Sequence, residues 1–236
     1  MPRTGSSSLA KAFAVFRKEA AIERRTRHGL ASALLFGFGA VLVHGLSSFG
    51  VSPPAQTVAA TLVSLLVLTS VVALPRAFLV EEDQGTMSLL RLHADPWAAV
   101  IGKAWYVCVQ ALVGAAVLTP VYVAISGAKV ADPVLLGAGA ALAAIGCSLG
   151  VSLCGALALG AQGRTMVAAG IALPMLFPVA LLAFPAVHAG LGGVPSAQGW
   201  RAVLGLAGWE IAVGALYPLL ASSVWRLAQV ETPPRR

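Results

Sequence analysis

Long apolar runs alternate with short connections rich in proline, glycine or charge along the chain. Each run approaches the length that an α-helix needs to cross the hydrocarbon core of a membrane, roughly 20 residues at 1.5 Å rise each. The breaks divide the apolar sequence into six expected helices, over residues 30–49, 57–79, 104–126, 133–160, 166–187 and 202–225. The pattern therefore predicts an all-α integral membrane protein with six transmembrane helices.

The composition agrees with this class. Of 236 residues, 58% are hydrophobic and only 11% are charged, whereas ordinary soluble domains carry about 25% charge. The first apolar run begins only near Leu30, and no clear small-residue cleavage site precedes the further runs. A removable secretory signal is therefore disfavoured, and a water-soluble globule is excluded.

The distribution of lysine and arginine predicts the orientation. Fourteen of the sixteen basic residues lie in the N-terminal arm, the second and fourth connections and the tail, and only Lys129 and Arg201 lie in the other connections. The positive-inside rule then places both termini in the cytoplasm. We expect a basic arm over 1–27, a six-helix membrane domain over 28–229 and a cytoplasmic tail over 230–236. The net charge of +7 is a topology signal and needs no nucleic acid to explain it.

The N-terminal arm is amphipathic when it is drawn as a helix over residues 8–27. Its apolar face consists of Leu9, Phe13, Phe16 and Ala20, and a second face carries Lys11, Lys18 and Arg25. A helix of this kind can lie in the plane of the membrane interface and bind anionic lipid. The alternative is a solvated basic arm that only fixes the topology. We predict the interfacial helix, because the phenylalanines would otherwise be exposed to water.

The second connection carries an acidic cluster in a chain that has only nine acidic residues. Glu81, Glu82 and Asp83 stand side by side after an apolar run. Gly85 suits the left-handed position at a helix C-terminus, and Thr86 suits the N-cap of a new helix. The simple alternative is a solvated acidic turn.

A short amphipathic helix is predicted directly after these acids. Its apolar face would consist of Met87, Leu90 and Ala94, and Asp95–Pro96 would end it. Trp97 suits an interfacial anchor, and Lys103 can extend to the membrane surface at the start of the third span. The exposed apolar face favours a contact with another protein over a solvated turn.

The motifs in residues 75–103 resemble the CcmB family of haem exporter protein B. They are Pro-Arg-Ala-Phe, Glu-Glu-Asp-x-Gly-Thr, a leucine-rich turn, Pro-Trp-Ala and Gly-Lys. The resemblance implies the permease subunit of the ABC transporter complex of cytochrome c maturation, with the fold of six-helix ABC exporters. In such a fold, residues 81–96 form a coupling helix that binds the ATPase subunit. The residues expected to make this contact are Glu81, Glu82, Asp83, Gly85, Thr86, Met87 and Leu90.

The resemblance also implies partners and a location. They are a CcmA-like ATPase dimer, a second copy of the chain, a CcmC-like haem-handling subunit, a small CcmD-like membrane subunit and a CcmE-like haem chaperone. ATP would act through the ATPase, haem would be handled by the partner subunits, and the chain would bind no cofactor directly. The expected location is the bacterial inner membrane. The alternatives are an ABC exporter permease for a lipid, glycan or drug, a secondary carrier, or a membrane scaffold that transports nothing.

Few residues suggest chemistry. The sequence contains no GxxxxGK[ST] phosphate loop, HExxH or GxSxG motif, so we expect no enzymatic activity in this chain. Three cysteines fall in apolar runs without metal-binding spacing and are interpreted as small buried hydrophobes. His44 and His188 are expected near the outer ends of their helices, where a bare interfacial role is favoured over haem ligation.

Two features inside the spans remain open. Glu210 is expected about eight residues into the last helix, where an acid is either a functional group or is satisfied by a wet cavity or a neighbouring helix. Gly146 and Gly150 form a GxxxG pattern, which allows helices to approach closely within one chain or between two copies.

Overall fold

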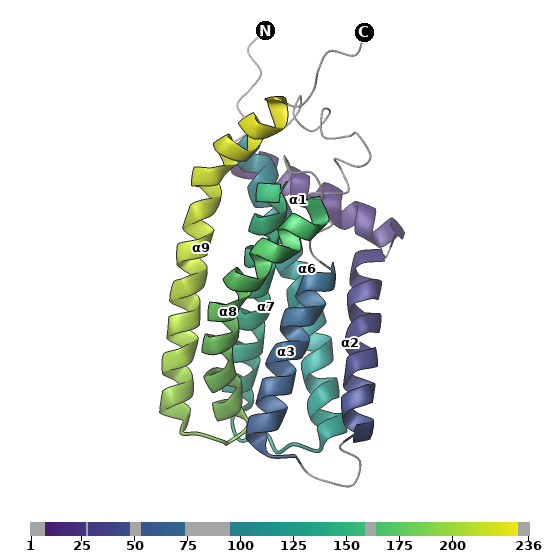
Figure 1. Cartoon of the computed structure of the whole chain (residues 1–236), viewed down its shortest axis with the longest axis vertical. Helices are drawn as coiled ribbons and strands as arrows, with labels where there is room; N and C mark the ends of the chain where they lie inside the picture. The colour runs from purple at the N-terminus through teal and green to yellow at the C-terminus, as the bar shows by residue number, and fades with distance from the viewer. Residues whose placement is uncertain (1–7, 27, 48–52, 74–94, 159–163, 231–236) are drawn as a thin grey trace.

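The computed structural model describes residues 8–26, 28–47, 53–73, 95–158 and 164–230. These residues form helices joined by short turns, with α1 lying across one end of a bundle of long helices (Figure 1). The helices are α1 (Ser8–Thr26), α2 (His28–Ser47), α3 (Ala55–Ala73), α6 (Pro96–Ser126), α7 (Pro133–Leu157), α8 (Arg164–Gly190) and α9 (Ser196–Val230). The described chain is therefore all-helical, as the sequence predicts.

Local sequence signals fix the ends of the two central helices. An extended aspartate precedes each of α6 and α7, and a proline occupies the first turn, where its missing N–H leaves no donor unsatisfied. The Asp132 side chain accepts a hydrogen bond from the Leu135 backbone N–H at 3.0 Å and thereby caps α7. Gly127 adopts a φ of 65° and ends α6 in the left-handed conformation that glycine favours.

Two helices begin six or more residues before the position that the sequence predicts. α6 starts at Pro96 instead of 104, and α9 starts at Ser196 instead of 202. The prediction began each span just after a charged residue, Lys103 or Arg201, because only uncharged sequence suits the hydrocarbon core. The helical backbone continues past that limit, so the 31 residues of α6 extend roughly 46 Å, beyond the roughly 30 Å of hydrocarbon. The end of the second expected span, 74–79, lies outside the described residues.

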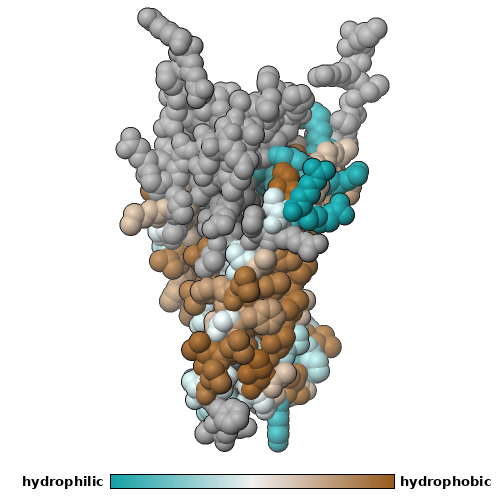
Figure 2. Space-filling view, turned by 90° about the vertical axis from the view of Figure 1, so that its right-hand side faces the viewer, coloured by the Kyte–Doolittle hydropathy of each residue, from teal (hydrophilic) through white to brown (hydrophobic). Residues whose placement is uncertain are grey.

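Four of the described helices are long and apolar enough to cross a membrane. The qualifying stretches are Gly29–Ser47, Trp97–Ser126, Pro133–Leu157 and Met166–Gly190, and α3 adds a shorter apolar stretch, Ala55–Val71. Apolar side chains cover much of the visible flank of the bundle, below a hydrophilic group near its upper end (Figure 2). The chain is therefore a multi-pass membrane protein, and the count of six spans stays a prediction.

Helix α7 lies at the centre of the bundle and packs against α3, α6, α8 and α9. Its small residues allow this. A Cβ atom added to Gly146 would meet the Val179 side chain of α8 at 3.1 Å and the Glu210 carboxylate of α9 at 3.3 Å, and one added to Gly150 would meet Leu176 of α8 at 3.6 Å. The GxxxG pattern is thus used for close packing within one chain.

The two ends of the bundle differ in their connections. α1 and the last turns of α9 lie at one end, and the α6–α7 and α8–α9 connections lie at the other (Figure 1). The first end carries the basic residues of α1, whereas the α6–α7 connection contains Lys129 and α9 carries Arg201 near its start. This arrangement agrees with the predicted charge asymmetry, and the assignment of the α1 end to the cytoplasm remains a prediction.

Thiol labelling will check the sidedness. Single cysteines at the exposed residues Lys129 and Gln198 should react with a membrane-impermeant maleimide in intact cells, whereas a cysteine at Arg25 should react only after permeabilisation. A background without Cys108, Cys147 and Cys154 provides the matched control. Labelling of Lys129→Cys and Gln198→Cys from opposite sides would contradict the fold itself, and reversal of all three would contradict only the orientation.

Candidate functional site: the junction of α1 with the start of α6

The residues predicted to contact an ATPase lie outside the described residues. This applies to Glu81, Glu82, Asp83, Gly85, Thr86, Met87 and Leu90. The structure does describe Asp95, near the end of the predicted coupling segment, and the helix α6 that begins directly after it. It also describes α1, which packs along the first turns of α6. The candidate site is therefore the junction between these two helices.

Gly102 brings the backbones of the two helices together. A Cβ atom at this position would lie 2.7 Å from the Val15 Cβ and still closer to the Ala12 carbonyl oxygen, distances that a real side chain does not tolerate. Ala12 and Val15 form the face of α1 that is buried here. α1 is therefore seated directly on the α6 backbone, and any larger residue at 102 would push it away.

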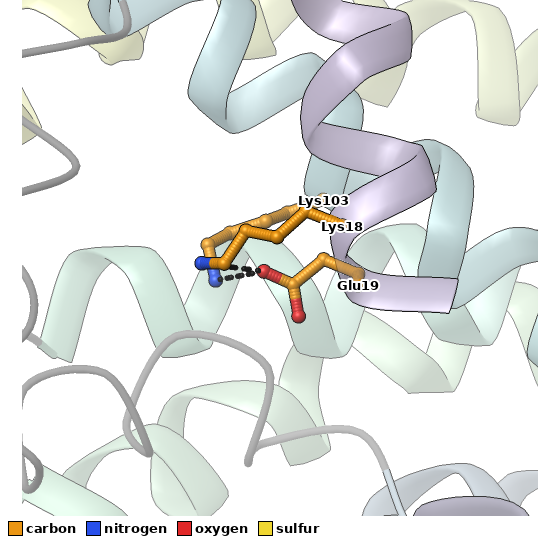
Figure 3. Close-up of polar contacts among 3 residues, drawn as sticks. All are labelled: Lys18, Glu19 and Lys103. Carbon is orange, nitrogen blue, oxygen red and sulfur yellow. Dashed lines mark hydrogen bonds and ion pairs between the residues drawn. The ribbon is translucent and has the colours of Figure 1, made fainter. Parts of the chain in front are cut away.

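A buried ion pair stands beside this contact. The Lys103 ammonium lies 3.2 Å from Oε1 of Glu19, and the exposed fractions of the two side chains are only 1% and 11%. The Lys18 ammonium approaches the same oxygen at 3.5 Å, so two cations converge on one carboxylate (Figure 3). Removing one member of a buried pair typically costs about 3–5 kcal/mol, because the other charge loses its compensation. The Lys103 ammonium therefore ends against α1, and its predicted extension to the membrane surface stays a prediction.

A second ion pair ties α1 to the residue that precedes α6. The Lys11 ammonium donates to Oδ2 of Asp95 at 2.7 Å. Both side chains are substantially exposed, at 39% and 55%, so this pair contributes at most about 1 kcal/mol to stability. Its importance is positional, because it joins the first turn of α1 to the C-terminal end of the predicted coupling segment.

The other end of α1 is tied to α2. Oε1 of Glu23 accepts a hydrogen bond from the Leu30 backbone N–H at 2.8 Å, and Oε2 accepts one from the Gly29 N–H at 3.4 Å. These N–H groups belong to the first turn of α2, where no carbonyl within the helix can pair with them. A carboxylate at a helix N-terminus also interacts favourably with the helix dipole, by about 0.3–1 kcal/mol.

The remaining surface of α1 is exposed and mixed. Leu9, Phe13 and Ile22 are about half exposed, and Phe16 stacks on Phe13 with ring centroids 5.9 Å apart. The exposed basic residues of the same helix are Arg17, Lys18, Arg24 and Arg25. The predicted apolar face is thus distinct from the face that packs on α6. Its contact with lipid remains a prediction.

Glu210 lies further along its helix than the sequence indicates. Because α9 begins at Ser196, the acid is fourteen residues along the helix, roughly 21 Å from its start. The residue is 9% exposed, and its Oε1 has no hydrogen-bond partner among the described residues. It packs close to Gly146, as described above. Its functional role stays a prediction, since this environment identifies no ligand.

The structure places the two candidate histidines against different aromatic rings. The ring of His44 packs near Tyr122, with centroids 5.5 Å apart, and the ring of His188 near Phe184, with centroids 5.4 Å apart. No cluster of three or more metal-ligating side chains occurs among the described residues. The geometry therefore gives no support to a shared haem site.

Sequence inspection identified the acidic connection but missed the acids of the junction. Glu19 and Glu23 are two of the nine acidic residues and stand in an otherwise strongly basic arm, four residues apart. Lys11, Val15, Glu19 and Glu23 follow one helical face at intervals of four. This periodicity is a signal that could have indicated a packed face that contains charge.

The helical bundle and the amphipathic helix docked across its end define a multi-pass integral membrane protein. A family model described as CcmB protein matches residues 10–227, so the chain belongs to the CcmB family. Comparison with curated proteins finds no match. The family consists of permease subunits of an ABC transporter that functions in haem transport and cytochrome c biogenesis.

A pair of glycine substitutions will test the junction. Gly102→Ala should lower the free energy of unfolding by about 1–3 kcal/mol, the usual cost of overpacking, and detach α1 from α6. Gly114→Ala, in the same helix, is the control, because a Cβ there meets nothing within 4 Å; it should be neutral or stabilising by up to about 1 kcal/mol. Thermal unfolding of the detergent-purified protein measures both. Equal melting temperatures for the two variants would contradict the close contact.

Proposed function

We propose that this chain couples ATP hydrolysis by a separate ATPase subunit to haem delivery, or to release of a haem-loaded chaperone, on the periplasmic side of the inner membrane. The observation that carries this proposal is the family match over residues 10–227, nearly the whole chain. The family implies membership of an ABC complex with an ATPase partner. ATP would bind that partner, and the chain would contribute the moving membrane part.

The coupling contact is assigned to residues 81–96. Its support is the motif Glu-Glu-Asp-x-Gly-Thr followed by an apolar face, at the end of the chain's second apolar run. Three adjacent carboxylates would complement a basic groove, and the apolar residues after them would supply buried area. The structure supports a mechanical role to the extent that Asp95, the penultimate residue of this segment, is held by Lys11 of α1.

The assembly is proposed to contain two copies of this chain with two ATPase subunits. An ABC exporter requires two permease halves, and a symmetric pair is the simplest arrangement. The CcmC-like, CcmD-like and CcmE-like partners would handle haem. Because the small-residue face of α7 is already occupied by α8 and α9 within the chain, contact between copies would use other helices.

A permease for a lipid, glycan or drug is the alternative within the same mechanical class, and a secondary carrier or a scaffold lies outside it. A carrier is expected to place charged groups near the midplane. Glu210 is an acid of this kind, but a single acid with no identified ligand does not favour a carrier. The family match favours the haem-related function.

Reversal of the acidic cluster tests the coupling contact. Changing Glu81, Glu82 and Asp83 to Lys should reduce copurification of the ATPase at least tenfold, because like charges would face the basic groove. Membrane insertion should be unchanged. Reversing Arg235 and Arg236 in the tail to Glu is the control for a change of charge. Copurification at the normal level with the triple variant would exclude these acids from the contact.

Haem content provides a separate check. The purified chain should show no haem absorbance band, and His44→Ala combined with His188→Ala should leave its spectrum unchanged, because the two rings pack against separate aromatic neighbours. The measurement is the Soret region of protein purified from haem-replete cells. A band that the double substitution removes would place a haem site on this chain.

A further inference from the structure

The α1–α6 junction contains a buried ion pair, although packing alone would not require one. An apolar contact would hold α1 in place at least as well as a buried ion pair, since replacing buried pairs by apolar residues is often neutral or stabilising. Glu19 and Lys103 are nevertheless almost fully buried and 3.2 Å apart, next to the glycine that admits the α1 backbone. What a buried pair adds over an apolar contact is a defined geometry.

Three contacts along one face of α1 reach three different parts of the chain. Lys11 binds Asp95 just before α6, Glu19 binds Lys103 at the end of the second turn of α6, and Glu23 caps the start of α2. The contacts extend over most of the 19 residues of α1. A helix of this length is roughly 28 Å long and stiff on this scale. α1 thus joins the start of α2 to the start of α6.

We propose that Glu19 and Lys103 are positioning residues that make α1 and the first turns of α6 one rigid strut, which carries displacement from Asp95 to α2 as well as to α6. The proposal rests on the proposed function for the source of that displacement. The strut consists only of described residues. Its consequence is that a push at one connection moves two membrane helices together.

Distance measurements on the chain alone test the strut without any ATPase. Spin labels at the exposed residues Ala14 of α1 and Trp105 of α6, in a background with the native cysteines changed to alanine, should give one narrow distance distribution in lipid nanodiscs. Glu19→Gln should broaden it at least twofold, because the carboxylate charge that fixes the geometry is lost. Arg17→Gln, also on α1 but exposed, is the matched control and should leave the distribution narrow. A narrow distribution in Glu19→Gln would overturn the proposal.

A second arm uses the complete complex. Glu19→Gln should retain copurification of the ATPase within twofold, while formation of mature cytochrome c falls at least tenfold. Lys103→Arg, which keeps the cation, should recover more of that activity than Lys103→Met.

Normal activity in Glu19→Gln, or equal activity in the two Lys103 variants, would overturn the strut. Loss of ATPase copurification in Glu19→Gln would also overturn the strut, because the ion pair would then serve to dock the ATPase. Failure of the proposed function can be told apart from failure of the strut with the wild-type chain. If only the proposed function fails, this chain purifies without an ATPase, and its spin-label distance distribution stays narrow.

Discussion

The structure depends most on one constraint, the seating of α1 on the backbone of α6. Gly102 allows the two helices to touch, and the Glu19–Lys103 pair satisfies the charges that this closeness buries. Both conditions must hold together, because a side chain at 102 would separate the charges and an uncompensated Lys103 would require water. The amphipathic helix α1 is therefore attached to the helical bundle through specific contacts of this one face.

The sequence predicted the positions of the helices well, because exposing backbone polar groups or charges to hydrocarbon is costly and this cost determines which segments form membrane helices. It predicted their ends less well. α6 and α9 continue beyond the uncharged stretch, since a helix can continue into the interface where charge is tolerated. The acids of the junction were missed for a related reason. Glu19 and Lys103 are 84 residues apart, and nothing local to either residue indicates that they meet.

Two sequence-based hypotheses were open, and the structure decides one of them. The GxxxG pattern of α7 could have served contacts within a chain or between copies, and its glycines pack against α8 and α9. Glu210 remains undecided in function, although its position along α9 and its burial are now defined. The acidic connection that first distinguished the sequence lies outside the described residues, and its importance rests on the family and on the contact that holds Asp95.

The central position of α7 has a consequence for assembly. This helix leaves the ribosome before α8 and α9, the helices that cover its small residues. For that interval its glycine-lined face must be occupied by lipid, by α6 or by an insertion factor, and the final packing must displace whatever stands there. Assembly of the bundle is therefore completed from its C-terminal side, so a chain truncated before α8 would expose the most closely packed surface of α7 to the membrane.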